Sequence, residues 1–398
     1  MLFVGPNEPY LGYVSDVLPS LGEEGVQTCT LRDLVAEGAV AGPETDPEVA
    51  RLKASAELVA AVEPAVRFYE EPPSEGVRVE THWSDIWLSA ADWASAFGAP
   101  DPGTPHNEAR DQVWEELLTI LVDKHDGDAP EEQLRASLRR NRELFALFDR
   151  AWPLIEAADL VADLWSVPAY LRRCAPWLTA EEVRRLRRAD AQAWTESDLP
   201  ILDAARLRLG DPEASRRRRR HEAAAAAERE QMDRVVESLL ADETLADADA
   251  DGEGALVMLR GEDLRESLAT ADRPSGVEPD VLAGPFAHIV VDEAQELTDA
   301  QWQMLIRRCP SRSFTVVGDR AQARNGFPET WRERLERVGL DRITLASLTV
   351  NYRTPEEIMA EAAPVIRAAL PDANVPVSVR SSGIPVAHGR AEDLDTVL

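Results

Sequence analysis

Three short apolar runs, each followed by glycine or polar residues, are the feature that most limits what this 398-residue chain can fold into. The runs, with the residues that end them, are Met1–Val4 before Gly5-Pro6-Asn7, Ile289–Val291 before Asp292-Glu293, and Ser313–Val317 before Gly318-Asp319. Buried parallel strands are continuous apolar runs, and their carboxyl ends meet at one edge of the sheet, where α/β proteins bind ligands. We therefore predict an α/β fold with one parallel sheet, in which these runs are buried strands and their polar ends converge.

Helices are expected between and after these runs. Apolar residues recur at helical spacing over residues 10–18, and Pro19 is expected to stop that helix. Thr298 and Gln301 have the spacing of a capping box, which predicts a helix that begins there and carries an apolar side. The alternation of apolar and polar residues at 77–83, followed by the apolar run 86–88, predicts a small β-hairpin.

Residues 343–398 carry the signals of a further strand and helix. The run at 343–350 is mostly apolar and predicts another strand. Thr354 is predicted to cap the next helix, with Pro355 in its first turn and Glu357 closing the capping box. Pro364 falls inside this helix and is expected to kink it.

Residues 43–283 differ in composition from the segments on either side. They are rich in Ala, Arg, Glu and Leu and are predicted to be mainly helical. The five consecutive arginines Arg216–Arg220 could bind a polyanion, but nearby glutamates favour an exposed, charge-balanced helix. Six acidic residues and no basic ones lie between 241 and 254, which predicts a flexible acidic loop.

The net charge of −30, from 43 basic and 73 acidic residues, argues against broad, non-specific binding to nucleic acid, which needs a basic surface. It suits docking on a basic partner, or serves solubility alone. Cys29, Cys174 and Cys309 form neither a disulfide framework nor a metal-ligand spacing, so a cytoplasmic protein is expected. No apolar run approaches the roughly 18–20 residues of a membrane span, and the N-terminus lacks the features of a signal peptide. We expect a monomer without membrane contact.

Asp292 and Glu293 are the strongest candidates for chemistry. Mg²⁺ is usually held by one or two carboxylates together with substrate phosphates, and a second carboxylate can orient a water for attack on a phosphoryl group. Adjacent acids after an apolar run also occur simply as the start of a helix. These two residues taken alone leave both interpretations open.

Longer motifs favour the first interpretation. VVDEAQELTDAQWQML at 290–305, VVGDRAQ at 316–322 and LTVNYRTPEEI at 348–358 resemble, in order and spacing, motifs II, III and IV of UvrD/Rep-type helicases of superfamily 1. The opening LFVGPNEPYLGYVSDVLPSLGEEGV resembles the HelD-type branch, whose members are motor-like factors that bind bacterial RNA polymerase and help recycle it. Further fragments resemble the same branch, so that the resemblance covers nearly the whole chain: PHNEAR at 105–110, Trp152–Trp165 and Trp194–Ala205.

The resemblance implies a role for each matching residue in ATP hydrolysis. Asp292 would hold Mg²⁺, directly or through water, and Glu293 would be the base that positions the attacking water. Gln295 would link the nucleotide state to neighbouring motifs. Gln322 would sense the γ-phosphate of ATP, and Asp319 would hold the turn of that motif.

Two further roles would fall to residues of a second motor domain. Arg353 would act as an arginine finger, since a planar guanidinium suits the charge of a phosphoryl transition state. Tyr352 would stack on the adenine of ATP. The alternatives are that Tyr352 is a core residue and that Gln295 and Asp319 are only hydrogen-bonding scaffold.

The resemblance also implies a domain plan. Residues 1–45 and 284–344 would form the two parts of one P-loop NTPase-like, RecA-like motor domain. A mainly helical insertion at 46–283 would separate them, and residues 345–398 would begin a second RecA-like domain.

The two lysines, Lys53 and Lys124, bear on nucleotide binding. Neither lies in the G-x-x-x-x-G-K-[ST] phosphate loop that cradles the phosphates of ATP. The chain is therefore expected to be an internal piece of a longer motor. On its own it is expected neither to bind ATP tightly nor to hydrolyse it.

Three functions are compatible with the sequence. The first is a HelD-type, ATP-dependent factor that remodels or recycles bacterial RNA polymerase. The second is a UvrD-like, ATP-dependent DNA helicase or translocase, which should present basic and aromatic contacts to single-stranded DNA. The third is a non-enzymatic module that binds polymerase through its acidic surface. The acidic character of the insertion favours the first over the second.

Overall fold

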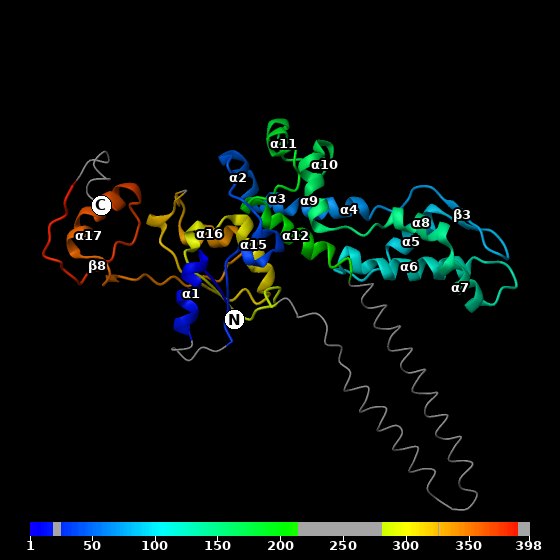
Figure 1. Ribbon diagram of the computed structural model, residues 1–398, viewed down its shortest axis with the longest axis horizontal. Helices are drawn as coiled ribbons and strands as arrows, with labels where there is room; N and C mark the ends of the chain where they lie inside the picture. Colours follow the sequence, from blue (N-terminus) through cyan, green and yellow to red (C-terminus); the bar gives the residue numbers. More distant parts are fainter. Residues whose placement is uncertain (19–24, 214–280, 325, 389–398) are drawn as a thin grey trace, which may run out of the picture. The chain divides into compact units, whose positions relative to one another are not determined.

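The computed structural model (Figure 1) describes residues 1–18, 25–213, 281–324 and 326–388. The arginine run and the acidic loop considered above lie outside these described residues. The chain divides into two compact units. Unit 1 comprises residues 1–59, 194–200 and 282–398, and unit 2 comprises residues 60–193 and 201–281.

Unit 1 is built on a parallel four-stranded sheet with the strand order β2-β1-β5-β6. The strands are β1 (Leu2–Val4), β2 (Gln27–Cys29), β5 (Ile289–Val291) and β6 (Phe314–Val316). β1 lies between β2 and β5, with Leu2 in register with both Gln27 and Ile289. The predicted α/β class with a parallel sheet is confirmed, and β2 is a strand that the sequence analysis missed.

The helices of unit 1 begin where side chains cap them. Asn7 accepts a hydrogen bond from the N–H of Tyr10 (3.0 Å), and Thr298 with Gln301 forms the predicted capping box. Trp302 is fully buried and packs edge-on against Phe314, with ring centroids 6.1 Å apart, which joins its helix to the sheet. The helices are α1 (Glu8–Val17), α2 (Pro47–Lys53), α3 (Ala56–Ala60, whose last residue belongs to unit 2), α15 (Asp299–Arg308) and α16 (Trp331–Arg337), with the 3₁₀ turns η2 (Arg32–Leu34), η3 (Ala36–Ala39), η4 (Glu196–Asp198), η5 (Ala294–Glu296) and η6 (Arg320–Gln322).

Two of the predicted strands differ from the structure. β6 is not buried: Phe314 and Val316 are half-buried, because β6 is the edge of the sheet among the described residues. Of the run 343–350, only the last residue enters a strand, β7 (Val350–Asn351), which pairs in parallel with β8 (Val377–Ser378). Leu348 is 80% exposed. An apolar run becomes a strand only where a second strand pairs with it, and β8 pairs with Val350 alone of this run.

The predicted helix after Thr354 is present as α17 (Glu356–Ala369), but its predicted capping box is wrong, because no side chain caps this helix. The N–H of Thr354 donates to Asn351 Oδ1 (3.0 Å). Glu357 does not close a capping box because its carboxylate accepts hydrogen bonds from residues after β8, including the N–H of Gly383 (2.8 Å). The helix continues through Pro364.

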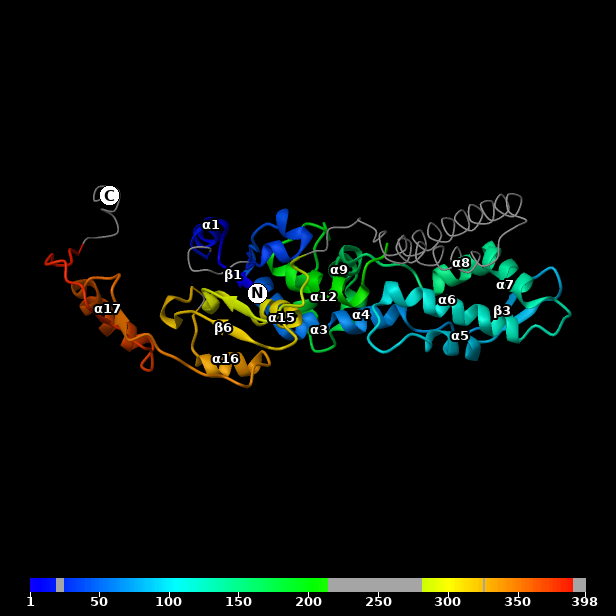
Figure 2. The same cartoon turned by 90° about the horizontal axis from the view of Figure 1, so that it is seen from below.

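Unit 2 is helical apart from one hairpin, as far as its residues are described. β3 (Val77–Val79) and β4 (Ile86–Leu88) pair antiparallel, as predicted. The buried side of the hairpin shares an apolar core with α5 to α8, which Figure 2 shows gathered beside β3. Among the described helices, none combines the length and the apolar character that crossing a membrane requires. The helices are α4 (Val62–Tyr69), α5 (Ala90–Phe97), α6 (His106–Asp123), α7 (Glu131–Arg140), α8 (Arg142–Ala151), α9 (Ala157–Ser166), α10 (Pro168–Cys174), α11 (Ala180–Leu186) and α12 (Leu199–Leu209, whose first two residues belong to unit 1).

The PHNEAR sequence at 105–110 places polar side chains inside unit 2. Asn107 and Arg110 are only 1% and 6% exposed. Asn107 Nδ2 donates to the carbonyls of Ile155 (2.9 Å) and Gly210 (3.1 Å), and its Oδ1 accepts from the N–H of Ile155 (3.0 Å). Buried polar groups must be hydrogen-bonded to be tolerated. Asn107 therefore joins the start of α6 to the chain that precedes α9 and to the chain that follows α12.

One of the two lysines is buried in unit 1. Lys53 is 2% exposed, and its Nζ lies 3.0 Å from Glu44 Oε2 and 2.8 Å from Asp198 Oδ1. Burial disfavours the charged form of Glu44, but the hydrogen bond and charge of Lys53 outweigh it and lower the pKa of this carboxyl. The N–H of Gly42 also donates to the carbonyl of Trp194 (3.0 Å). These contacts hold residues 194–200 against the N-terminal part of unit 1.

Candidate functional site

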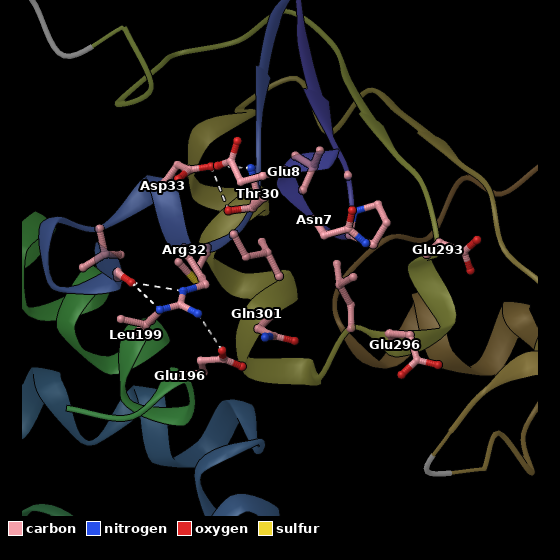
Figure 3. A pocket seen from close by; sticks show the side chains of 18 of the residues that line it. Asn7, Glu8, Thr30, Arg32, Asp33, Glu196, Leu199, Glu293, Glu296 and Gln301 are labelled. Carbon is pink, nitrogen blue, oxygen red and sulfur yellow. Dashed lines mark hydrogen bonds and ion pairs between the residues drawn. The ribbon is translucent and has the colours of Figure 1, made fainter. Parts of the chain in front are cut away.

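The carboxyl ends of β1 and β5 line a cavity of about 1050 Å³ (Figure 3). Gly5 and Asn7 follow β1, Asp292 and Glu293 follow β5, and Thr30 follows β2. The predicted convergence of the first two polar ends is confirmed. The third polar end, Gly318-Asp319 after β6, does not line the cavity. It is connected to this edge by the hydrogen bond from the N–H of Asp319 to Gln295.

Asp292 is held at the edge of the sheet from three directions. Its N–H donates to the carbonyl of Val4 (3.0 Å), which continues the pairing of β5 with β1. Its Oδ1 accepts from the N–H of Glu293 (2.9 Å), and its Oδ2 accepts a hydrogen bond from the hydroxyl of Tyr10. That hydrogen bond, with burial and the charges of both carboxylates, raises the pKa of Tyr10 to about 12. Asp292 is therefore a fixed carboxylate with both oxygens engaged.

Glu293 has an unusual backbone. Its φ of 51° and ψ of 35° lie in the left-handed region, which costs a residue with a Cβ atom roughly 1–2 kcal/mol. Its side chain is half-buried, and Oε2 accepts a hydrogen bond from Gln295 Nε2 (2.5 Å). Strained conformations of this kind cluster at functional sites, where the surrounding structure enforces them. The left-handed backbone therefore adds to the evidence that Glu293 is a functional residue.

Gln295 connects the ends of β5 and β6. It is 6% exposed, donates to Glu293, and accepts at Oε1 from the N–H of Asp319 (3.1 Å). Gly318 permits this approach, because a Cβ atom there would lie 2.6 Å from Gln295 Oε1. Asp319 in turn accepts from the N–H of Ala321 (2.9 Å), which forms the turn η6. One buried amide thus ties the second carboxylate to the loop after β6.

The remaining predicted residues lie at exposed positions. Gln322 Nε2 donates to Asp319 Oδ2 (2.8 Å). Tyr352 is 80% exposed, so it is not a core residue. Arg353 follows β7, and its N–H donates to Asn351 Oδ1 (3.0 Å). The positive charge of Arg353 acts on Tyr10, where it opposes the rise in pKa that Asp292 causes. The structure therefore gives Arg353 an electrostatic effect on Tyr10, but no described contact joins Arg353 to Asp292 or Glu293.

The donor set of this edge fits Mg²⁺ in an open site. Among the residues that the structure describes, no three His, Cys, Asp or Glu side chains gather as metal ligands. Asp292 and Glu293 are adjacent, half-buried carboxylates beside a cavity. Mg²⁺ is usually held by one or two carboxylates, with waters and substrate phosphates completing its coordination. Asp292 and Glu293 therefore suit a metal that arrives with a phosphate ligand better than a permanently bound one.

Acidic side chains outnumber basic ones in the wall of the cavity by six to two. Arg32 is one of its two arginines, and it is already bound to Glu196 (3.0 Å) and to the carbonyl of Gly38 (2.8 Å), as Figure 3 shows in part. The acidic residues of the wall are Glu8, Asp33, Glu196, Asp292, Glu293 and Glu296. A bare polyanion would meet repulsion here, whereas a phosphate accompanied by a divalent cation would not.

Tyr10 is the site residue that the sequence analysis missed. Its place in the apolar pattern of α1 was accounted for by helix packing alone. The signal that could have found it is its position in the first turn of a helix that starts at the carboxyl end of a strand. Such a turn faces the ligand-binding edge of a parallel sheet.

Comparisons with known proteins add no relative to this picture. No protein-family model matches the chain. No curated protein matches it either. What the structure itself defines is an α/β protein with a parallel sheet and a carboxylate pair at the edge where such sheets bind ligands.

Proposed function

We propose that this chain carries the metal-binding and water-positioning part of an ATP-hydrolysing centre in a motor of the UvrD/Rep type. In this proposal unit 1 contains a RecA-like, P-loop NTPase-like sheet, and ATP with Mg²⁺ binds at its carboxyl edge. The observation that carries the proposal is the bridge through Gln295, which joins Glu293 to the N–H of Asp319 (3.1 Å). Through this link, a change at the carboxylate pair would reach the loop that follows β6.

Each residue then has a task that its surroundings support. Asp292 would hold Mg²⁺, which supplies neutralisation of the phosphate charge when bound. Glu293, oriented by Gln295, would accept a hydrogen bond from the attacking water. Gln322 would reach the γ-phosphate from the turn that Asp319 holds.

Two exposed residues would meet the nucleotide from the segment after β7. Arg353 would supply positive charge to the transferring phosphoryl group. Tyr352, with its ring 80% exposed, would be free to stack on adenine. Both roles require that this segment bind the same nucleotide as Asp292.

For the partner of the motor, we propose bacterial RNA polymerase, as in the HelD-type branch, and a cytoplasmic location. The support is electrostatic: the chain carries a net charge of −30, and acidic side chains outnumber basic ones in the wall of the cavity at Asp292. Such a surface complements basic channels that otherwise hold nucleic acid. A UvrD-like action on DNA is the second candidate. It would need basic and aromatic contacts to the strand.

We expect the immobilised chain to retain core bacterial RNA polymerase at about 0.15 M salt and to lose it as salt rises, because exposed charges are screened within about 8 Å at that ionic strength. Lysozyme is applied to the immobilised chain as the control protein, because it is basic but unrelated to transcription. A single-stranded oligonucleotide is the third ligand applied to the chain.

Binding of these three ligands distinguishes the candidate functions. Retention of polymerase without lysozyme supports the proposed partner. Retention of the oligonucleotide and not of polymerase would assign the chain to DNA instead. Equal retention of polymerase and lysozyme would reduce the interaction to simple ion exchange and contradict a specific partner.

A further inference from the structure

Tyr10 makes a contact with the carboxylate pair that no role described so far requires. Its hydroxyl donates a hydrogen bond to Asp292 Oδ2, and the two residues are separated by 282 positions in the sequence. The contact is therefore a product of the fold, made possible because β1 and β5 are neighbours in the sheet. Phenol donors to a carboxylate form strong, charge-assisted hydrogen bonds.

The position of the Tyr10 ring is fixed on two sides. The N–H of Tyr10 donates to Asn7 Oδ1 (3.0 Å), the cap of α1, so the first turn of the helix sets the backbone. The ring stacks on Phe3 of β1, with centroids 6.4 Å apart and an interplanar angle of 29°. Tyr10 is only half-buried, so water could satisfy its hydroxyl if the hydrogen bond to Asp292 were broken.

The consequence falls on the oxygen atoms of Asp292. Oδ1 is engaged by the N–H of Glu293 (2.9 Å), which is part of the backbone and cannot leave without unfolding the turn. Oδ2 is engaged by a side-chain hydroxyl, which can rotate away. Oδ2 is therefore the oxygen that we expect a divalent cation to take, and there the cation would meet the hydroxyl of Tyr10.

We propose that Tyr10 is a positioning residue that holds Asp292 Oδ2 until a divalent cation arrives and competes with that cation for the oxygen. This inference rests on the proposed role of Asp292 as a Mg²⁺ ligand. It goes beyond that role by assigning the hydroxyl of Tyr10 a negative effect on cation affinity. The competition would keep the site free of metal until a phosphate ligand adds its own affinity.

The test is Mn²⁺ binding to the whole chain, measured by electron paramagnetic resonance in wild type and in Tyr10→Phe. The variant keeps the ring and its stack on Phe3 and removes only the hydroxyl. We expect about tenfold tighter Mn²⁺ binding, since a hydrogen bond to a charged group no longer has to be broken. Tyr13→Phe is the matched control, because Tyr13 lies on the same helix and is 69% exposed. It should bind Mn²⁺ as wild type does.

Asp292→Asn separates failure of this inference from failure of the proposed function. Mn²⁺ binding that is tighter in Tyr10→Phe than in wild type, and that disappears in Tyr10→Phe/Asp292→Asn, supports competition between Tyr10 and the cation. Equal or weaker binding by Tyr10→Phe, still dependent on Asp292, overturns the competition and leaves Asp292 as a metal ligand. Mn²⁺ binding that does not depend on Asp292 in any variant overturns both.

A second measurement does not depend on the variant being well folded. The chain has five tyrosines, so the ¹³Cζ resonances of labelled tyrosine form a small set. Titration of wild type with Mg²⁺ should move the resonance of Tyr10, as its hydroxyl leaves Asp292, while that of Tyr13 stays in place. A Tyr10 resonance that does not move at Mg²⁺ concentrations that saturate the site would contradict the inference.

Discussion

Replacement of Lys53 by methionine is expected to lower the free energy of unfolding of unit 1 by about 3–5 kcal/mol, the range for removing one partner from a buried ion pair. Lys53 is 2% exposed and neutralises Glu44 and Asp198, which are 12% and 0% exposed. Methionine fills a similar volume but removes the positive charge that Glu44 and Asp198 contact. Denaturant unfolding, with hydrogen exchange of peptides from residues 40–54 and 194–200, measures the loss.

Arg51→Met is the matched control for this prediction. Arg51 lies on the same helix and pairs with Glu48 (3.1 Å), but its side chain is 61% exposed. Exposed pairs contribute roughly 0–1 kcal/mol, so this variant should be close to wild type. If both variants unfolded at the same denaturant concentration as wild type, the buried cation would not be what holds residues 194–200 in unit 1.

The second large effect is expected in unit 2, from Asn107→Ala. Asn107 is 1% exposed and satisfies three backbone groups, two of Ile155 and one of Gly210. Each buried group left without a partner costs roughly 1–3 kcal/mol, so a loss of about 3 kcal/mol or more is expected. Faster hydrogen exchange should appear at Ile155 and around Gly210, in segments that lie far from residue 107 in the sequence.

Gln112→Ala is the control on the same helix. Gln112 makes one exposed hydrogen bond, from the N–H of Asp101 (3.2 Å), and its loss should change stability by less than about 0.5 kcal/mol. A comparable loss in Asn107→Ala and Gln112→Ala would mean that the PHNEAR sequence owes its pattern to something other than burial.

The elements that could be predicted are those whose pattern and environment agree. Ile289–Val291 is β-branched, buried and bounded by polar residues, and it forms a central strand. Gln27–Cys29 is neither an apolar run nor a regular alternation, so its strand could not be predicted from its own sequence. The segment is a strand because it pairs with β1. The run 343–350 shows the reverse case, since apolar residues without a paired neighbour do not make a strand.

The candidate site divides in the same way. Asp292 and Glu293 could be placed because parallel strands deliver their carboxyl ends to one edge. The left-handed backbone of Glu293 could not be predicted, because residues with a Cβ atom rarely adopt it and no sequence pattern indicates it. The hydrogen bond from Tyr10 depends on β1 lying beside β5, which is a property of the sheet order and not of either segment.

The central claim is that the carboxyl edge of β1 and β5 holds a divalent cation on Asp292. Iron-directed cleavage tests it most directly, because Fe²⁺ bound in place of Mg²⁺ generates hydroxyl radicals that cut the nearest backbone. With ascorbate and peroxide, the cuts mapped by mass spectrometry should fall at residues 5–10 and 291–295. Excess Mg²⁺ and Asp292→Asn should each suppress them. A cleavage pattern that neither Mg²⁺ nor Asp292→Asn changes would contradict the claim.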